Sequence, residues 1–393
     1  MKKSDNFAVC VDSWFDGVRY HQKPTTFVVQ KNSVDSITEG DHGEDLTKQG
    51  LAVIHGGFLM PGLVDAHVHL FLDGAPTDGT TRSAHLKKSV AELTEAAHDN
   101  ARQSLACGVT LVRDAGDRHG INHAIRKEAE TAGSKIAKVR SAGRGVKRPK
   151  RYGAFMALDV DDATSIVDSV SQLTADSDEI KLILTGIIDF DAGAVTDAPQ
   201  FNLEHTKLMV ETAKAHRRKT FVHCSGEKGL AIAAQAGVGS IEHGFFMTRE
   251  ILTMMRDRQI AWTPTFCPVH FQWAHPQVIG WSDSTIDNLR RILDDHAEHL
   301  RLADEMGVTL LMGTDAGSMG VEHGYAMFDE IERYLESGLS LEKTLTAATS
   351  AARRHFEYSH SQLLPGAPFE AVLLEHSPFS DTQVLRKPLR VWI

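Results

Sequence analysis

The sequence has few cysteines, no long apolar run and no excess of positive charge. Only four cysteines occur in 393 residues, far apart and without a CxxC pair, which argues against a disulfide framework and fits a reducing compartment. No stretch approaches the roughly 20 apolar residues of a membrane helix, and the N-terminal Met-Lys-Lys is not followed by an apolar run long enough for a signal peptide. A formal net charge of −10 disfavours nucleic acid and anionic membranes as partners. We therefore expect a cytoplasmic protein that acts on a small molecule, with homo-oligomerisation left open.

The middle of the chain differs from its two ends in the pattern of apolar and polar residues. Residues 1–59 carry short β-like runs separated by turns rich in glycine, aspartate and lysine, and β-like runs return in residues 360–393. Residues 60–359 alternate strand-like runs with long helix-like patterns, which is typical of βα units around a parallel sheet. The sequence thus predicts an α/β protein with a barrel over residues 60–359. Residues 1–59 plus 360–393 are expected to form a small composite β-sandwich domain.

The number of βα units indicates the kind of parallel architecture. Eight strand-like runs within about 280 residues match the size of a (β/α)₈ TIM barrel. The predicted strands are Leu63–Leu70, Val109–Arg113, Lys135–Ser141, Ile180–Leu184, Thr220–His223, Ser240–Glu242, Ile260–Pro264 and Thr309–Met312.

Metal-ligating residue types fall at the carboxyl ends of these strands. His67 and His69 lie two residues apart on the first strand, so their side chains point to one face. Two such imidazoles can bind one metal ion, although for an isolated pair hydrogen-bonded core histidines are the preferred explanation. Later strands supply four further candidates, namely Lys181, His223, His243 and Asp315. Because barrel active sites form at the carboxyl ends of the strands, all six side chains are expected to converge.

The motifs around these residues resemble those of the amidohydrolase superfamily. Within it, the nearest likeness is to the imidazolonepropionase-like branch, which includes dipeptidases of the prolidase type. The likeness spans nearly the whole chain. The matching stretches are PGLVDAHVHL, VTLVRDAG, EIKL, SIEHG, GTDAG and AATSAAR.

This resemblance implies a binuclear metal centre with two divalent ions, zinc being favoured. In such a centre His67, His69 and Asp315 would hold the first ion, and His223 and His243 the second. Lys181 would bridge the two ions as N6-carboxylysine, since a carbamate offers two hard oxygens to two cations. A metal-bridging hydroxide would be the nucleophile. Asp315 would be the catalytic residue, as general base and then general acid.

A different role for Lys181 remains open at this stage. Glu179 lies two residues earlier on the same strand, so the alternation of side chains places both on one face. A simple Lys181–Glu179 ion pair inside the barrel is therefore an alternative to the carbamate.

Substrate contacts are less well defined by the sequence. A basic loop follows the third strand, with five cations between residues 144 and 151, and arginine suits the binding of carboxylates. The alternative is a solvated surface loop. The candidate substrate-binding residues are Arg144, Arg148, Arg151, Tyr152, His270 and His323.

The sequence therefore predicts a metal-dependent hydrolase of a carbon–nitrogen bond, similar to amidohydrolases and dipeptidases. A carboxylate-bearing N-acyl amino acid or dipeptide is the expected substrate class. Hydrolysis of a cyclic amide, lactone, ester or carbamate is the alternative, because the same site would activate water against any of these carbonyls. A catalytically silent barrel that serves as a binding or scaffold protein is a further alternative.

Overall fold

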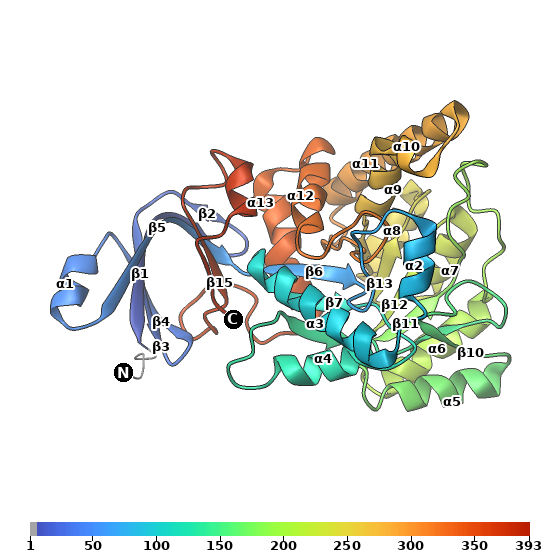
Figure 1. Ribbon diagram of the computed structural model, residues 1–393, viewed down its shortest axis with the longest axis horizontal. Coiled ribbons are helices and arrows are strands. Elements are labelled where there is room, and N and C mark those ends of the chain that lie inside the picture. Colours follow the sequence, from blue (N-terminus) through green and yellow to red (C-terminus); the bar gives the residue numbers. More distant parts are fainter. Residues whose placement is uncertain (1–5) are drawn as a thin grey trace.

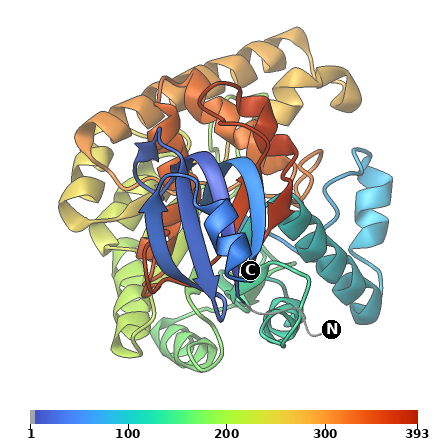
Figure 2. The same cartoon turned by 90° about the vertical axis from the view of Figure 1, so that its left-hand side faces the viewer.

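A seven-stranded sheet built from both ends of the chain forms the smaller part of the molecule. The structure is a computed structural model that describes residues 6–393. The sheet has the order β16-β15-β5-β1-β3-β4, with β2 paired to β1, and it projects from one end of the barrel (Figures 1 and 2). Its strands are β1 (Phe7–Phe15), β2 (Tyr20–His21), β3 (Thr25–Gln30), β4 (Ser33–Glu39), β5 (Ala52–Pro61), β15 (Ala371–Leu374) and β16 (Arg390–Val391).

The pairing of β15 with β5 joins the two ends of the chain. These strands run antiparallel, with Leu373 opposite Leu59, and both side chains belong to a separate apolar core that also contains Trp14 and Phe27. Both ends of the chain therefore contribute strands to one continuous hydrogen-bonded sheet, and the composite β-sandwich domain stays a prediction. The exact domain bounds at residues 59/60 and 359/360 stay predictions.

The larger part is a parallel barrel of TIM type. Seven of its strands are β6 (Leu63–Val68), β7 (Val109–Asp114), β8 (Lys138–Ser141), β11 (Ile180–Ile183), β12 (Thr220–Cys224), β13 (Ser240–His243) and β14 (Ala261–Thr263). Each of them coincides with a predicted strand. Two additional short strands, β9 (Gly145–Lys147) and β10 (Ala157–Asp159), lie in the region that the sequence analysis treats as a basic loop, and β9 pairs with β11.

The predicted eighth strand is the most weakly formed one. It appears as a parallel bridge between Leu310 and Trp262, flanked by a hydrogen bond from the amide of Leu311 to the carbonyl of Trp262. On its other side the amide of Ala66 on β6 donates to the carbonyl of Met312 at 2.8 Å. Residues 309–312 therefore link β14 to β6 and occupy the eighth position of the barrel, which confirms the predicted fold class.

Most helices surround the barrel and cover its outer face, whereas α1 lies beside the sheet domain (Figure 1). Their limits follow local capping signals: Ser89 and Glu92 form a capping box at the start of α3, and α11 ends at Gly307, whose φ of 79° suits glycine. The helices are α1 (Gly43–Lys48), α2 (Gly79–His85), α3 (Val90–Ala106), α4 (Ile121–Ala129), α5 (Ala163–Leu173), α6 (Leu203–Ala215), α7 (Glu227–Ala236), α8 (Arg249–Arg258), α9 (Cys267–Ala274), α10 (Pro276–Ile279), α11 (Asp283–Met306), α12 (Ala326–Glu336), α13 (Leu341–Thr346), the π-helix η1 (Ala347–Ala351), α14 (Ala352–His355) and the 3₁₀-helix η2 (Thr382–Arg386). Within residues 6–393, none of the helices combines the length and the apolar character that crossing a bilayer requires.

The Pro61-Gly62 step carries the chain from the sheet into the barrel. A Cβ atom at Gly62 would lie 2.2 Å from the hydroxyl oxygen of Thr110, so the close approach of β6 to β7 requires glycine here. Arg353 on α14 donates to the carbonyl of Gly62 at 2.7 Å and to the hydroxyl of Thr110 at 2.8 Å. These contacts fix the start of β6, and with it the position of the two histidines at its far end.

Candidate active site

His67, His69 and Asp315 meet where β6 and the loop after the eighth strand come together. The Nε2 atoms of His67 and His69 lie 3.6 Å and 3.7 Å from the same carboxylate oxygen of Asp315. The three side chains form one of two groups in residues 6–393 whose His, Cys, Asp or Glu ligand atoms all lie within 4.8 Å of one another. This arrangement suits a divalent cation, because two imidazole nitrogens and a carboxylate oxygen are common ligands of zinc.

The other two predicted histidines adjoin this group. The ring of His243 lies 5.0 Å from that of His67 and 4.5 Å from that of His223, measured between centroids. His223 is the penultimate residue of β12 and His243 the last residue of β13, and both are buried. The structure therefore brings the four histidines and Asp315 to one place, as the sequence analysis expects.

Hydrogen bonds to Nδ1 orient three of the imidazoles. His67 Nδ1 donates to the carboxylate of Glu242 at 2.7 Å, and His69 Nδ1 donates to the carbonyl of Gly116 at 3.1 Å. His243 Nδ1 is hydrogen-bonded to the hydroxyl of Thr265 at 2.7 Å. In each case Nε2 is left for the centre of the site, which is the usual arrangement of metal-binding histidines. His223 differs, since its Nε2 lies 3.4 Å from the carbonyl of Gly186.

Lys181 is buried beside these residues without a hydrogen-bond acceptor. Across the described part of the chain, neither its Nζ nor the Nε2 of His243 has a hydrogen-bond partner, although both atoms are buried. The ammonium group lies 4.8 Å from the centre of the Phe221 ring. A buried lysine without an acceptor is costly as a cation, so this position suits a lysine that is neutral or chemically modified.

Glu179 is paired with arginines and not with Lys181. Its carboxylate oxygens lie 3.3 Å from Arg113 and 3.2 Å from Arg140. These two guanidinium groups hold the pKa of Glu179 below its usual value despite its burial. The Lys181–Glu179 ion pair that the sequence left open is therefore not formed in this structure.

Burial sets the protonation states of the site. Desolvation lowers the pKa of His69 and of His223 to about 3, and it moves the pKa values of His67 and His243 well below the usual range. The imidazoles are thus neutral near pH 7, as metal ligands must be. Desolvation also lowers the pKa of Lys181 to about 8 and raises that of Asp315 to about 6. A lysine with this pKa is about one-tenth neutral at pH 7, far more than an ordinary lysine. Only a neutral amine can react with carbon dioxide.

Three residues at the strand ends adopt left-handed backbone conformations. The φ angles of His243, Thr265 and Asp315 are 66°, 52° and 56°. Such angles are unfavourable for residues other than glycine, and they gather at functional sites where the surrounding structure enforces them. Here the turn at His243 breaks the alternation of β13, so Glu242 and His243 both contribute to the site.

Sequence reasoning missed a buried network beneath the site. Glu242 accepts hydrogen bonds from Arg113 at 2.8 Å, from Ser240 at 2.6 Å and from His67 at 2.7 Å. Asp65 binds the amide and hydroxyl of Thr314 and so ties the Asp315 loop to β6. The sequence did contain a signal for this network, because Asp65 and Glu242 are acids inside apolar strands. Buried carboxylates need hydrogen-bond or charge partners.

A cavity of about 290 Å³ opens beside the histidines and is lined mainly by apolar side chains. Phe155, Ile188, Phe190 and Met319 are among them. Of the six predicted substrate contacts, only Tyr152 lines this cavity, and its ring lies 5.1 Å from that of His223. Burial and the nearby Asp315 raise the pKa of the Tyr152 hydroxyl, which therefore stays protonated.

The remaining five predicted contacts lie outside the lining of this cavity, and their role in substrate binding stays a prediction. Arg148 donates to backbone carbonyls of Val160, Asp161 and Gln200, and it packs on Phe201. Arg151 donates to the carbonyl of Ala198 at 2.5 Å, and Arg144 is exposed. In this structure the guanidinium groups of Arg148 and Arg151 therefore bind neighbouring backbone carbonyls.

The two other histidines are engaged elsewhere. His270 on α9 lies 2.8 Å from a guanidinium nitrogen of Arg333 and lines a different cavity. His323 is 1% exposed, and its Nε2 donates to the carbonyl of Leu72 at 3.1 Å. Both are therefore positioned as structural residues.

Arg82 on α2 is the arginine that lines the cavity, and the sequence analysis did not single it out. Its guanidinium donates to the carbonyls of Asp73, Pro76 and Gly317 at 2.9–3.3 Å. Those bonds use three of the five N–H groups that a guanidinium carries. Its charge also interacts with Asp315, so the cation faces the catalytic end of the cavity.

Comparison with known proteins places this site in a family. The model of the amidohydrolase family matches residues 58–393. The chain belongs to this family. It is accordingly a hydrolase acting on carbon–nitrogen bonds, in a family whose members generally bind divalent metals.

Individual relatives are distant but similar over most of their length. An uncharacterised protein of Mycobacterium tuberculosis is 28% identical over 305 residues, covering 77% of this chain and 75% of that protein. Ochratoxinase of Aspergillus niger is 24% identical over 358 residues, covering 85% of this chain and 73% of the enzyme.

Solved structures share the complete fold. A Xaa-Pro dipeptidase with methionine bound in its active site superimposes with a TM-score of 0.83 at 22% identity, over 98% of this chain and 97% of that one. The structure of A. niger ochratoxinase gives a TM-score of 0.81 at 20% identity, over 100% of this chain and 95% of that one. Both parts of the fold, barrel and sheet domain, are therefore common to these amidohydrolases.

Proposed function

We propose that this amidohydrolase uses two divalent ions, zinc being favoured, to cleave an amide bond in a carboxylate-bearing N-acyl amino acid or dipeptide. The observation that carries the metal centre is the convergence of four neutral histidines and Asp315 on the unpaired, buried Nζ of Lys181. His67, His69 and Asp315 would hold one ion, and His223 and His243 the other, with Lys181 between them as N6-carboxylysine.

The environment of Lys181 supports its role as the bridging residue. Its pKa of about 8 makes the neutral amine available to carbon dioxide. The carbamate would remove the unpaired cation from a buried position and would present two oxygens to the ions. Bound divalent ions would supply a water activated for attack and would polarise the substrate carbonyl.

Asp315 is placed to move the proton of the reaction. One carboxylate oxygen faces Nε2 of His67 and of His69, and the other accepts a hydrogen bond from Ser318 at 2.9 Å. Its pKa of about 6 lets the carboxylate take a proton from the attacking water and give it to the leaving nitrogen near neutral pH.

The first test of the proposal is the metal content of a Lys181→Ala variant. We expect the barrel centre to contribute two ions per chain in the protein loaded in the presence of bicarbonate, and Lys181→Ala to lose both its activity and these two ions. Elemental analysis after desalting measures this directly. The control is Lys138→Ala, which removes a lysine of β8 that pairs with Glu370 and should leave the metal content unchanged. Full metal content in Lys181→Ala would reject the bridging role.

The cavity supports the proposed substrate class. Its apolar walls suit a bulky hydrophobic group, and Arg82 offers a positive charge at the same opening. Two N–H groups of a fixed guanidinium can bind a carboxylate at two points. The cavity therefore favours an amide with a large apolar group on one side and a free carboxylate on the other.

Replacement of Arg82 by alanine should raise KM about 10- to 100-fold for carboxylate-bearing substrates, because it removes charge-assisted hydrogen bonds. The matched substrate is the same compound with its carboxylate converted to a primary amide, whose KM should change little. Arg151→Ala is the control variant, since Arg151 binds a backbone carbonyl outside the cavity. Equal effects of Arg82→Ala on the charged and the neutral substrate would contradict this role.

A hydrolysis screen distinguishes the proposed substrates from the alternatives. It should include N-acyl amino acids and dipeptides with aromatic or large aliphatic groups, together with hydantoins, lactones, esters and carbamates. Turnover of the first two classes is expected to be fastest. Preferred turnover of a neutral lactone or carbamate would replace the proposed substrate class while leaving the metal centre intact.

A further inference from the structure

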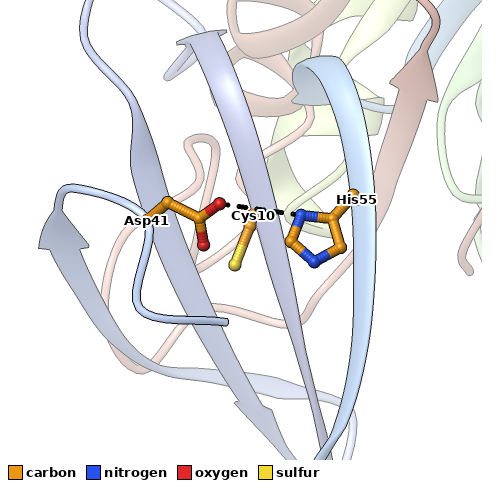
Figure 3. Close-up of side chains that lie close together, drawn as sticks. All are labelled: Cys10, Asp41 and His55. Carbon is orange, nitrogen blue, oxygen red and sulfur yellow. Dashed lines mark ion pairs between the residues drawn. The ribbon is translucent and has the colours of Figure 1, made fainter. Parts of the chain in front are cut away.

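A second group of metal-ligating side chains lies in the sheet domain, away from the barrel site. Figure 3 shows Cys10 on β1 between Asp41, in the loop after β4, and His55 on β5. Their ligand atoms all lie within 4.8 Å of one another. The thiol is 3% exposed, whereas the carboxylate and the imidazole are exposed.

The sheet register places two of the three residues side by side. Cys10 and His55 are paired residues of the parallel strands β1 and β5, so their side chains project from the same face. On the other side Cys10 is paired with Thr26 of β3, and its Sγ lies 3.5 Å from the Thr26 hydroxyl. This row across three strands places the thiol and the imidazole side by side on one face of the sheet.

Backbone contacts hold Asp41 over the same row. The hydroxyl of Thr26 donates to the carbonyl of Gly40 at 2.7 Å and accepts from the amide of His42 at 3.0 Å. The amide of Gly43 donates to one carboxylate oxygen of Asp41 at 2.8 Å. The second carboxylate oxygen faces Nδ1 of His55 at 3.8 Å, a distance too long for a hydrogen bond.

We propose that Cys10, Asp41 and His55 form a second metal site that binds Zn²⁺ or a similar thiophilic divalent cation. Sulfur, imidazole nitrogen and carboxylate oxygen are all ligands of zinc, and neighbouring ligands on one tetrahedral ion lie about 3.4–3.6 Å apart, given the usual bond lengths. The separation of 3.8 Å between Asp41 and His55 is close to this value. Rotation of these two exposed side chains brings all three ligands to an ion over the thiol.

The surroundings of the cluster favour a cation. A cavity of about 360 Å³ adjoins it, and the carboxylates of Asp12 and Glu375 also line this cavity. Water or Glu375 can therefore complete a tetrahedral site. Binding replaces the proton of the Cys10 thiol, which passes to solvent as the thiolate–metal bond forms. The sites are separate, because none of these residues belongs to the barrel.

The site is tested by titrating the metal-free full-length protein with Co²⁺. Cobalt bound to a thiolate gives a sulfur-to-metal charge-transfer band in the near ultraviolet, and the proposed barrel ligands include no sulfur. We expect this band in the wild-type protein and its loss in Cys10→Ser. The control Cys107→Ser should keep the band, since Cys107 is another buried free cysteine. Zinc analysis should show one ion fewer per chain in Cys10→Ser than in the wild type.

Substitutions at the exposed residues of the cluster test the metal site without disturbing the folded sheet domain. His55→Ala and Asp41→Ala change side chains on the surface of the sheet domain and should lower the affinity for Co²⁺ at least tenfold. His42→Ala, next to Asp41 but outside the cluster, should leave the affinity unchanged. Absence of the band in the wild type, or its persistence in Cys10→Ser, would overturn the proposal. Either result would leave the barrel site and its Lys181 test unaffected.

Discussion

Replacement of Asp315 by asparagine should lower kcat by about 10²- to 10⁴-fold, the usual contribution of a general acid and base. Asparagine retains the shape of the side chain and one oxygen ligand, but it accepts no proton. Folding should be little affected, because the left-handed conformation of residue 315 is tolerated by asparagine as well as by aspartate. Steady-state kinetics on a substrate from the hydrolysis screen measures the effect.

The pH profile distinguishes a proton-transfer role from a purely structural one. Asp315 acts as a base only when ionised, so wild-type kcat should rise with pH through the pKa of this group, about 6 without metal. Bound cations favour the carboxylate and move this acid limb to lower pH. The limb should be absent in Asp315→Asn.

Asp189→Asn is the matched control for this substitution, because Asp189 is exposed in the loop after β11 and binds the amide of Ala192. Metal analysis of both variants is needed, since Asp315 is also a proposed ligand. An Asp315→Asn variant with full metal content and more than a tenth of wild-type kcat would exclude Asp315 as the catalytic base.

The second large effect is expected at Glu242. Its carboxylate is 0% exposed and compensates the buried guanidinium of Arg113 while it orients His67. Glu242→Ala removes the nearer of two carboxylates that face Arg113 and leaves only Glu179, at 3.3 Å. Breaking a buried ion pair from one side costs about 3–5 kcal/mol of folding stability. Loss of the hydrogen bond to His67 should also weaken metal binding about 10- to 100-fold.

Two measurements separate these two consequences of Glu242→Ala. Urea denaturation in the presence of a chelator reports the stability of the metal-free protein, and zinc titration of the folded variant reports the affinity. Glu250→Ala is the control, since Glu250 lies in the exposed first turn of α8. A stability change below 1 kcal/mol for Glu242→Ala would show that Arg113 finds compensation elsewhere.

The strand ends could be predicted from sequence because the barrel imposes a strong constraint on them. A ligand at the end of one parallel strand must lie near ligands at the ends of the others, whatever the loops do. Counting βα units therefore predicts that His67, Lys181 and His223 lie close together. The eighth strand is weakly formed, yet residues 309–312 occupy its predicted position in the barrel. Asp315 follows in the next loop.

The partners of these residues could not be predicted in the same way. Alternation predicts Glu179 and Lys181 on one face, yet Arg113 and Arg140 from two other strands bind the carboxylate of Glu179. The left-handed backbone at His243 lets this residue reach the site beside its neighbour Glu242, against the simple alternation of a strand. Which side chain becomes the partner of a buried charge depends on contacts between elements far apart in the chain.

The basic loop between residues 144 and 151 likewise shows that the partners of loop side chains could not be predicted from the sequence. Arg148 and Arg151 have the composition of an anion-binding loop, but β9 and β10 direct their guanidinium groups to backbone carbonyls. Arg82, a single arginine in a polar helix, reaches the cavity because α2 follows the strand that carries His67 and His69. Composition identified the kind of side chain needed but not its position.

The order of the sheet also constrains how the chain folds during synthesis. β5 lies between β1 and β15, so one edge of it stays unpaired until residues 371–374 have been made. An unpaired strand edge is a template for pairing with other chains, and contacts between such distant segments form slowly. The barrel, whose strands all precede β15, can assemble while the sheet domain is still incomplete. We therefore expect early aggregation of nascent or truncated chains to proceed through β5, at the junction that leads directly into the active-site strand.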